Sequence, residues 1–279
     1  MPNEPPGFRR LVLGLQPSVP DRGLRLAIEF AELMRLELLG LFLEDSNLRV
    51  LAGTPFAREF RGPAAGWQPF DLESVSRDLD AMAATLRRMF EAAAGPLETE
   101  ARFEVLRGVL PGSIAPVLRS GDILAIVEPA SPAERMTSLY ASRGAAALRA
   151  AAAVLWVPAR IVRRRGPVVA IAATPDDSSV RAAAAIARAA REELVIIDAD
   201  HGGATAESTA AESGLKVERL ISPRGAFPDP AACAQAFREL RERLVVITRG
   251  AFDDSVASTI ASVRQVPVLV IAPATPVEG

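Results

Sequence analysis

The sequence predicts an α/β protein built from two similar units, each a five-stranded, mostly parallel sheet with helices on both faces. Three observations support this fold class. Short apolar runs without polar alternation recur along the chain, as expected for strands buried on both faces. These runs alternate with helix-like segments, which is the pattern of βαβ units. Finally, the second half of the chain repeats the first.

The repeat is visible at the level of single residues. Residues 10–45 and 167–200 each read as a strand, a proline-containing turn with an aspartate, a helix and a second strand. Asp21 matches Asp177 at an offset of 156 residues. The same offset relates Arg35, Glu37 and Leu38 to Arg191, Glu193 and Leu194. The final apolar runs, VLWVPA and VLVIAPA, also resemble each other, so the repeat covers both halves to their ends.

The same patterns predict the individual elements. In the first half we expect strands near 10–16, 37–43, 101–107, 122–128 and 153–158, and helices near 22–35, 72–94, 112–119 and 138–151. In the second half we expect strands near 167–173, 193–198, 215–221, 243–248 and 267–272, and helices near 178–191, 204–213, 229–241 and 254–263. The expected domains are 1–159 and 167–279. The arginine-rich residues 160–166 form a linker, interpreted as solvated rather than as a basic docking patch.

Composition excludes several classes of function. The formal net charge of −2 predicts no general attraction to nucleic acid or to anionic membranes. The only cysteine, Cys233, excludes an internal disulfide and a zinc site built from cysteines. The apolar stretches are too short to span a bilayer, and the N-terminal segment has no secretion pattern. We therefore expect a cytoplasmic protein.

Two five-stranded units of this order and size resemble the universal stress protein family, here as a tandem pair. The resemblance covers nearly the whole chain and depends on element order, lengths and repeat. It implies two Rossmann-like domains of the adenine-nucleotide-alpha-hydrolase-like type, related by pseudo-two-fold symmetry. In that family the last strands of two units pair across the axis, which implies that 154–157 and 268–271 meet as in a dimer. We expect the two sheets to remain separate rather than to form one continuous sheet.

ATP-binding members of the family carry G-x2-G-x9-G-[S/T] after the fourth strand. The same spacing here falls on Pro129, Pro132 and Ser142, followed by Arg143. Proline has no N–H to offer a phosphate, and Glu128 adds a negative charge beside the loop. A different anion site remains open as an alternative to plain polar surface residues. Its candidate residues are Arg135, Ser138, Ser142 and Arg143.

The second half departs from the family pattern differently, because its corresponding segment is six residues shorter. Asp253 and Asp254 stand where the next helix begins, a position that favours carboxylates, and Asp254 or Ser255 is the expected cap. The family's ATP binders also end the first strand with an aspartate, and the aligned residues here are Gln16 and Ala173. The resemblance therefore implies two dismantled nucleotide sites and no cofactor.

Other chemistry has little support in the sequence. Asp198, Asp200 and His201 follow one strand and could bind a metal, but a polar loop is the favoured interpretation. No G-x-S-x-G elbow accompanies the single histidine, and Cys233 is interpreted as a small buried residue. We expect no metal site and no enzymatic activity.

A long insertion, at about 45–72, interrupts the first half and has almost no counterpart in the second. It carries four aromatic residues, Phe56, Phe60, Trp67 and Phe70. An oligomer or partner contact and a local plug are equally favoured, with a lid on a small molecule third. Arg58 and Arg61 suit the rim of an interface. We expect residues 46–71 to be mostly non-regular or short helical structure.

These features together predict a non-catalytic, universal-stress-type binding or regulatory protein that does not bind ATP in the usual way. It would act through protein contacts, as a homo-oligomer or with a protein partner that binds residues 46–71. The alternative is a sensor that binds a nucleotide or another small anionic ligand in the first domain. Neither nucleic acid nor a membrane is expected as a partner.

Overall fold

The structure of the 279-residue chain is a computed structural model. It describes residues 7–16, 21–60, 62–108, 114–129, 131, 147–149, 151–174, 177–199, 215–221, 236–253 and 255–273. The predicted helix at 204–213 lies outside these residues, as do most of those at 138–151 and 229–241.

All ten predicted strands of the two units are present. The first half contributes β1 (Arg10–Leu15), β2 (Glu37–Asp45), β5 (Ala101–Gly108), β6 (Asp122–Val127) and β7 (Ala153–Val157). The second half contributes β8 (Val168–Ala172), β9 (Leu194–Asp198), β10 (Val217–Ile221), β11 (Leu244–Thr248) and β12 (Val268–Ile271). Most are rich in valine, leucine and isoleucine, which suits strands covered on both faces.

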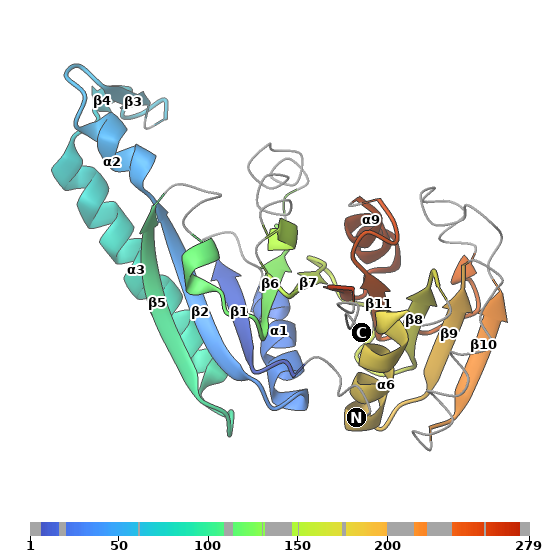
Figure 1. Cartoon of the computed structure of the whole chain (residues 1–279). Helices are drawn as coiled ribbons and strands as arrows, with labels where there is room; N and C mark the ends of the chain where they lie inside the picture. The colour runs from blue at the N-terminus through green and yellow to red at the C-terminus, as the bar shows by residue number, and fades with distance from the viewer. Residues whose placement is uncertain are drawn as a thin grey trace, which may run out of the picture.

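These strands form one ten-stranded sheet in the order β10-β9-β8-β11-β12-β7-β6-β1-β2-β5 (Figure 1). Neighbours within each half are parallel, whereas β12 and β7 are antiparallel, with Val268 opposite Trp156 and Ile271 opposite Ala153. The expected pairing of the last strands is therefore confirmed. The expectation of two separate sheets is wrong, because the same pairing satisfies the backbone groups that two free edges would expose.

Helices cover both faces of this sheet. On one face, α1 (Asp21–Leu33), α3 (Leu72–Ala94) and α6 (Ser178–Ala190) pack over a single large apolar core. On the other face, α9 (Ser255–Arg264) packs with Ala147, Leu148, Ala151 and Phe237. Residues 115–117, within a predicted helix, form only the short 3₁₀ turn η1 (Ala115–Val117). The pseudo-symmetric helices α1 and α6 thus lie on the same face, as a two-fold axis through the β7–β12 pair requires.

The insertion folds into regular structure of its own. Helix α2 (Ser46–Ala52) is followed by a small antiparallel hairpin of β3 (Arg58–Phe60) and β4 (Trp67–Pro69). Figure 1 shows this segment beyond the end of β2, at the upper left and away from the second half. The prediction of mostly non-regular or short helical structure missed the hairpin, which a cross-strand contact between Phe60 and Trp67 stabilises, with ring centroids 5.6 Å apart.

Val162, Arg164 and Arg165 of the linker are exposed, and two arginines of the linker also form ion pairs with the two halves. Arg163 lies 3.6 Å from the fully buried carboxylate of Glu242, which also forms a bidentate pair with Arg264 at 2.7 and 3.1 Å. Arg164 reaches Glu29 on α1 at 3.1 Å. Burying the Glu242 carboxylate without partners would cost free energy. Arg163 of the linker and Arg264 of α9 both pair with this carboxylate, so it connects the linker to α9.

Candidate functional site

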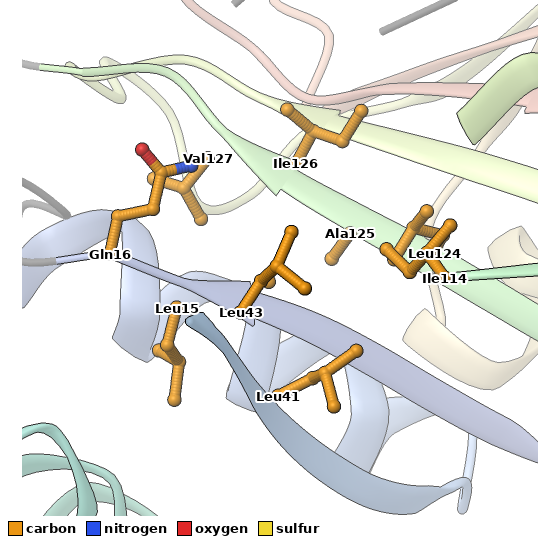
Figure 2. Close-up of a pocket in the computed structure, with 10 residues that line it drawn as sticks. Leu15, Gln16, Leu41, Leu43, Ile114, Leu124, Ala125, Ile126 and Val127 are labelled. Atoms are coloured by element: carbon orange, nitrogen blue, oxygen red, sulfur yellow. The ribbon is translucent and has the colours of Figure 1, made fainter. Parts of the chain in front are cut away.

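The strand order of the first half reverses at β1, which lies between β6 and β2. In open α/β sheets the carboxyl ends of strands diverge at such a point, and ligands bind in the crevice that results. A pocket of about 60 Å³ lies between the ends of β1 and β6 (Figure 2). Its walls include Gly14, Gln16, Leu41, Leu43, Ile114, Leu124 and Ile126.

The lining of this pocket is almost entirely aliphatic. Figure 2 shows Leu41, Leu43 and Leu124 around one space, with Gln16 at the end near Val127. The amide of Gln16 is the only polar side chain among the described residues that line the pocket, and no charged side chain lines it there. Sequence analysis singled out Gln16 alone. The signal that could have revealed the pocket was Gly14, a glycine inside an apolar strand.

Strand register identifies the equivalent positions in the two halves. Leu11 pairs with Leu38, and Val168 pairs with Leu194, the repeat partner of Leu38. Three residues further along, Gly14 therefore corresponds to Ile171, which is fully buried in the core. By the same register Gln16 corresponds to Ala173, as the sequence alignment proposed. The second half thus places an isoleucine side chain where the first has none.

In the second half, hydrogen bonds connect the end of β8, the start of α6 and the end of β11, where the strand order reverses. The carboxylate of Asp177 accepts from the backbone N–H groups of Ser179 and Ala173, both at 2.9 Å, and from the hydroxyl of Thr248 at the end of β11. The N–H of Ser179 also lies 3.2 Å from the Thr248 hydroxyl. A carboxylate of the chain itself therefore occupies the N-terminus of α6, where an anionic ligand would otherwise be stabilised.

The corresponding positions of the first half are apolar. Gly23 and Val127 stand where the second half has Ser179 and Thr248, and a Cβ on Gly23 would lie 2.4 Å from Val127 Cγ1. Asp21, the counterpart of Asp177, is exposed and pairs with Arg25 at 2.9 Å. The helix and the strand are therefore in direct contact in the first half, and the described residues form no polar network between them.

Glu128, which was predicted to add a negative charge beside the first loop, also contacts the second half of the chain. Its side chain is buried and accepts a hydrogen bond from Ser262 of α9 at 3.1 Å, so its carboxylate meets the second half of the chain. The equivalent residue, Arg249, donates to the carbonyl of Ala151 at 2.6 Å, in the opposite direction across the β7–β12 pair. These two residues connect the halves, and Pro129 after Glu128 is also buried.

Asp253 caps α9. Its carboxylate accepts hydrogen bonds from the N–H and the hydroxyl of Ser255, at 2.9 and 2.7 Å. Both bonds hold the pKa of Asp253 below its usual value, and the bond from the hydroxyl has the larger effect. Ser255, one of the two expected caps, is instead the first residue of α9 and donates to Asp253. Asp254 lies outside the described residues.

Several predicted site residues cannot be compared with the structure. Outside its described residues lie Pro132, Arg135, Ser138, Ser142 and Arg143 of the first loop, and Asp200, His201 and Cys233 of the second half. Asp198 is described and forms an ion pair with Arg219. Within the described part of the chain, no group of three or more histidine, cysteine or acidic residues could hold a metal ion.

The insertion brings most of its aromatic residues to the surface. Phe56 is 97% exposed, and the touching pair Phe60 and Trp67 is 57% and 60% exposed. Phe70 instead packs inward against Ala52, Val75 and Leu79. Val50 and Leu51 of α2 are also exposed, and we refer to Val50, Leu51, Phe56, Phe60 and Trp67 as the insertion patch.

An ion-pair network fixes the base of the insertion. Glu44, buried at the end of β2, pairs with Arg49 of α2 and with Arg107 of β5, whose Nε lies 3.3 Å away. Arg49 also donates to the Ser76 hydroxyl of α3 at 2.7 Å. Burial acts to raise the pKa of Glu44, but the hydrogen bonds and charges of the two arginines outweigh it and lower the pKa. The carboxylate therefore stays charged and holds α2 to the sheet.

Comparison with solved structures identifies the fold. A universal stress protein from Archaeoglobus fulgidus DSM 4304 superposes with a TM-score of 0.65 and 15% sequence identity, covering 95% of this chain and 96% of that chain. No protein-family model and no curated protein sequence matches the chain. No helix among the described residues is long and apolar enough to cross a bilayer. The chain therefore has, over nearly its whole length, the fold of a universal stress protein.

Proposed function

We propose that this chain is a non-catalytic, universal-stress-type regulatory protein that acts through protein contacts made by the insertion patch. The observation that carries the proposal is the exposure of Phe56, Phe60 and Trp67 on one short segment. Contiguous exposed apolar surface of this kind typically marks an interaction site. Aromatic residues also contribute most of the binding energy in many interfaces.

The base of the insertion supports an interface more than a lid. Glu44, Arg49 and Arg107 connect α2 to β2 and β5, and Ala52, Val75 and Leu79 form a small core beneath it. Arg58 donates to the Trp67 carbonyl at 3.0 Å and so holds the hairpin at its polar rim. A surface ordered before binding loses less conformational entropy when a partner binds. The exposed aromatic rings do not fit the alternative of a local plug.

We further propose that ATP is not bound in the usual way. Support comes from the buried Pro129 after β6, from Gln16 at the end of β1, and from the Asp177 network in the second half. The alternative, a sensor for a nucleotide or another anionic ligand, depends on Arg135, Ser138, Ser142 and Arg143.

The test of the interface is a triple substitution, Phe56→Ser, Phe60→Ser and Trp67→Ser, examined by sizing and light scattering with the full chain. We expect the variant to become a monomer if the wild type self-associates, or to lose a partner that co-purifies with the wild type. The matched control is Ile221→Ser with Val162→Ser, which removes comparably exposed apolar side chains elsewhere.

An unchanged particle and unchanged co-purification in the triple variant would contradict the proposal. Deleting residues 50–68 is the stronger form of the same test and should also change the oligomeric state or the solubility. If the control variant behaved like the triple variant, general surface hydrophobicity rather than the insertion patch would be responsible.

A further inference from the structure

We propose that the pocket between β1 and β6 binds the apolar end of a small uncharged molecule, whose polar group hydrogen-bonds the amide of Gln16. This second site is independent of the insertion patch. It lies at the switch point of the first half, at the edge of the sheet where open α/β folds place ligands.

The lining determines the chemical class of the ligand. Side chains such as Leu41, Leu124 and Ile126 offer only apolar contacts, and no charged side chain among the described residues lines the pocket. A carboxylate or phosphate placed there would lose its hydration without gaining an ionic partner among the described lining residues. The amide of Gln16 both donates and accepts, so it can pair with a hydroxyl or an amide group. A neutral ligand therefore fits this pocket better than an anion.

Gly14 is what keeps the pocket open. A Cβ built on Gly14 would meet only the Ala125 carbonyl oxygen, at 3.8 Å, so a side chain there would extend into free space. The second half has Ile171 at this position, fully buried in a filled core. Isoleucine is favoured in strands and glycine is not, so the first half keeps open a volume that the same fold can fill.

The volume sets the size of the bound group. A dry cavity of about 150 Å³ in another protein holds benzene, whereas this pocket measures about 60 Å³. Because the pocket is open at the end near Gln16, it buries the terminal carbons of an alkyl chain and does not enclose an aromatic ring system. Gln16 lies at one end of the pocket and is partly exposed, while Leu41 and Leu124 lie deeper (Figure 2). The ligand would place its alkyl end near the leucines and its polar group at Gln16.

The experiment is a titration of the full chain, with isoleucine methyl groups labelled for NMR, using hexanamide as the neutral probe and hexanoate as its anionic counterpart. We expect the methyl signals of Ile114 and Ile126, which line the pocket, to shift with hexanamide. Ile123 is the internal reference, because it is buried in the core of the opposite sheet face. Hexanoate should bind at least about tenfold more weakly, because its charge must be desolvated.

Three variants test the site itself. Gly14→Ile should fill the pocket and abolish the hexanamide shifts without lowering the melting temperature, and Gln16→Ala should weaken binding several-fold. The matched control, Ala173→Gln, adds the amide at the equivalent position of the second half and should leave binding unchanged. If Gly14→Ile fails to fold, the Gln16→Ala and Ala173→Gln pair still decides whether the amide takes part.

Clear outcomes would overturn the proposal. These are an absence of shifts with hexanamide, shifts that persist in Gly14→Ile, or equal affinity for hexanoate and hexanamide. Shifts that disappear when Phe56, Phe60 and Trp67 are replaced by serine would assign the binding to the insertion patch instead. The oligomeric state of Gly14→Ile should match that of the wild type, so failure here is distinguishable from failure of the proposed interface.

Discussion

The two halves of this sheet share one strand order but differ where that order reverses. In the first half Gly14 borders an aliphatic pocket between β1 and β6, and Gly23 of α1 packs directly against Val127. In the second half, Ile171 fills the corresponding space, and Ser179 and Thr248 join Asp177 in a buried network. The backbone arrangement tolerates both solutions, because apolar strands and their pairing decide the fold, while a few side chains at the strand ends decide the site.

The largest expected effect concerns the buried network of the second half. Asp177→Ala should destabilise the chain by about 3 kcal/mol, because it removes the cap of α6 and leaves the hydroxyl of Thr248 and the N–H of Ala173 unpaired. Asp21→Ala, at the equivalent exposed position, should cost less than about 0.5 kcal/mol. Denaturant unfolding of the two variants measures the difference. An equal loss of unfolding free energy in the two variants would show that Asp177 contributes no more to stability than Asp21.

A smaller effect is expected at the close contact of the first half. Gly23→Ala should destabilise by about 1–2 kcal/mol, because its Cβ would overlap with Val127 Cγ1. Adding Val127→Ala should recover part of this loss by removing the clashing methyl group. A double-mutant cycle measures the coupling free energy between the two positions. Additive effects would mean that the helix and the strand adjust independently.

A smaller, pH-dependent effect is expected at the cap of α9. The pKa of Asp253 is lower in the folded chain than its usual value of 3.8, so its charged form is the one that folding favours. Its contribution is therefore complete above about pH 5 and is lost as the pH falls through the lowered pKa. The stability difference between the wild type and Asp253→Ala should shrink over this range in acid unfolding curves. A difference that stays constant down to pH 2 would contradict this assignment.

The smallest expected effect is that of ATP. A ligand present at a hundred times its dissociation constant stabilises by about 2.7 kcal/mol, a shift of roughly 5–10 °C for a domain of about 150 residues. We expect almost no shift of the melting temperature with millimolar ATP and magnesium. A shift of several degrees that disappears in Arg143→Ala would instead support the sensor alternative in the first half.

Much of the fold could be predicted from local sequence. Unbroken runs such as those of β6 and β11 identified buried strands, and the offset between Asp21 and Asp177 identified the repeat. The hairpin of the insertion was missed because β3 and β4 have three residues each, too few for a periodic pattern, and β4 ends in Pro69. The continuous sheet was missed because the sequence of a terminal strand has the same apolar pattern whether or not another sheet pairs with that strand.

The sequence by itself determined the fold class, the internal duplication and the departure of both loops from the phosphate-binding glycine pattern, since these depend on residue type and on spacing along the chain. Only the tertiary structure decided that Glu128 contacts Ser262, that Thr248 meets Asp177, and that Gly14 borders an open pocket. Such contacts depend on strand register and on which face of the sheet each side chain occupies. A shift of one residue in the register of a strand would move the side chains of that strand to the opposite face of the sheet.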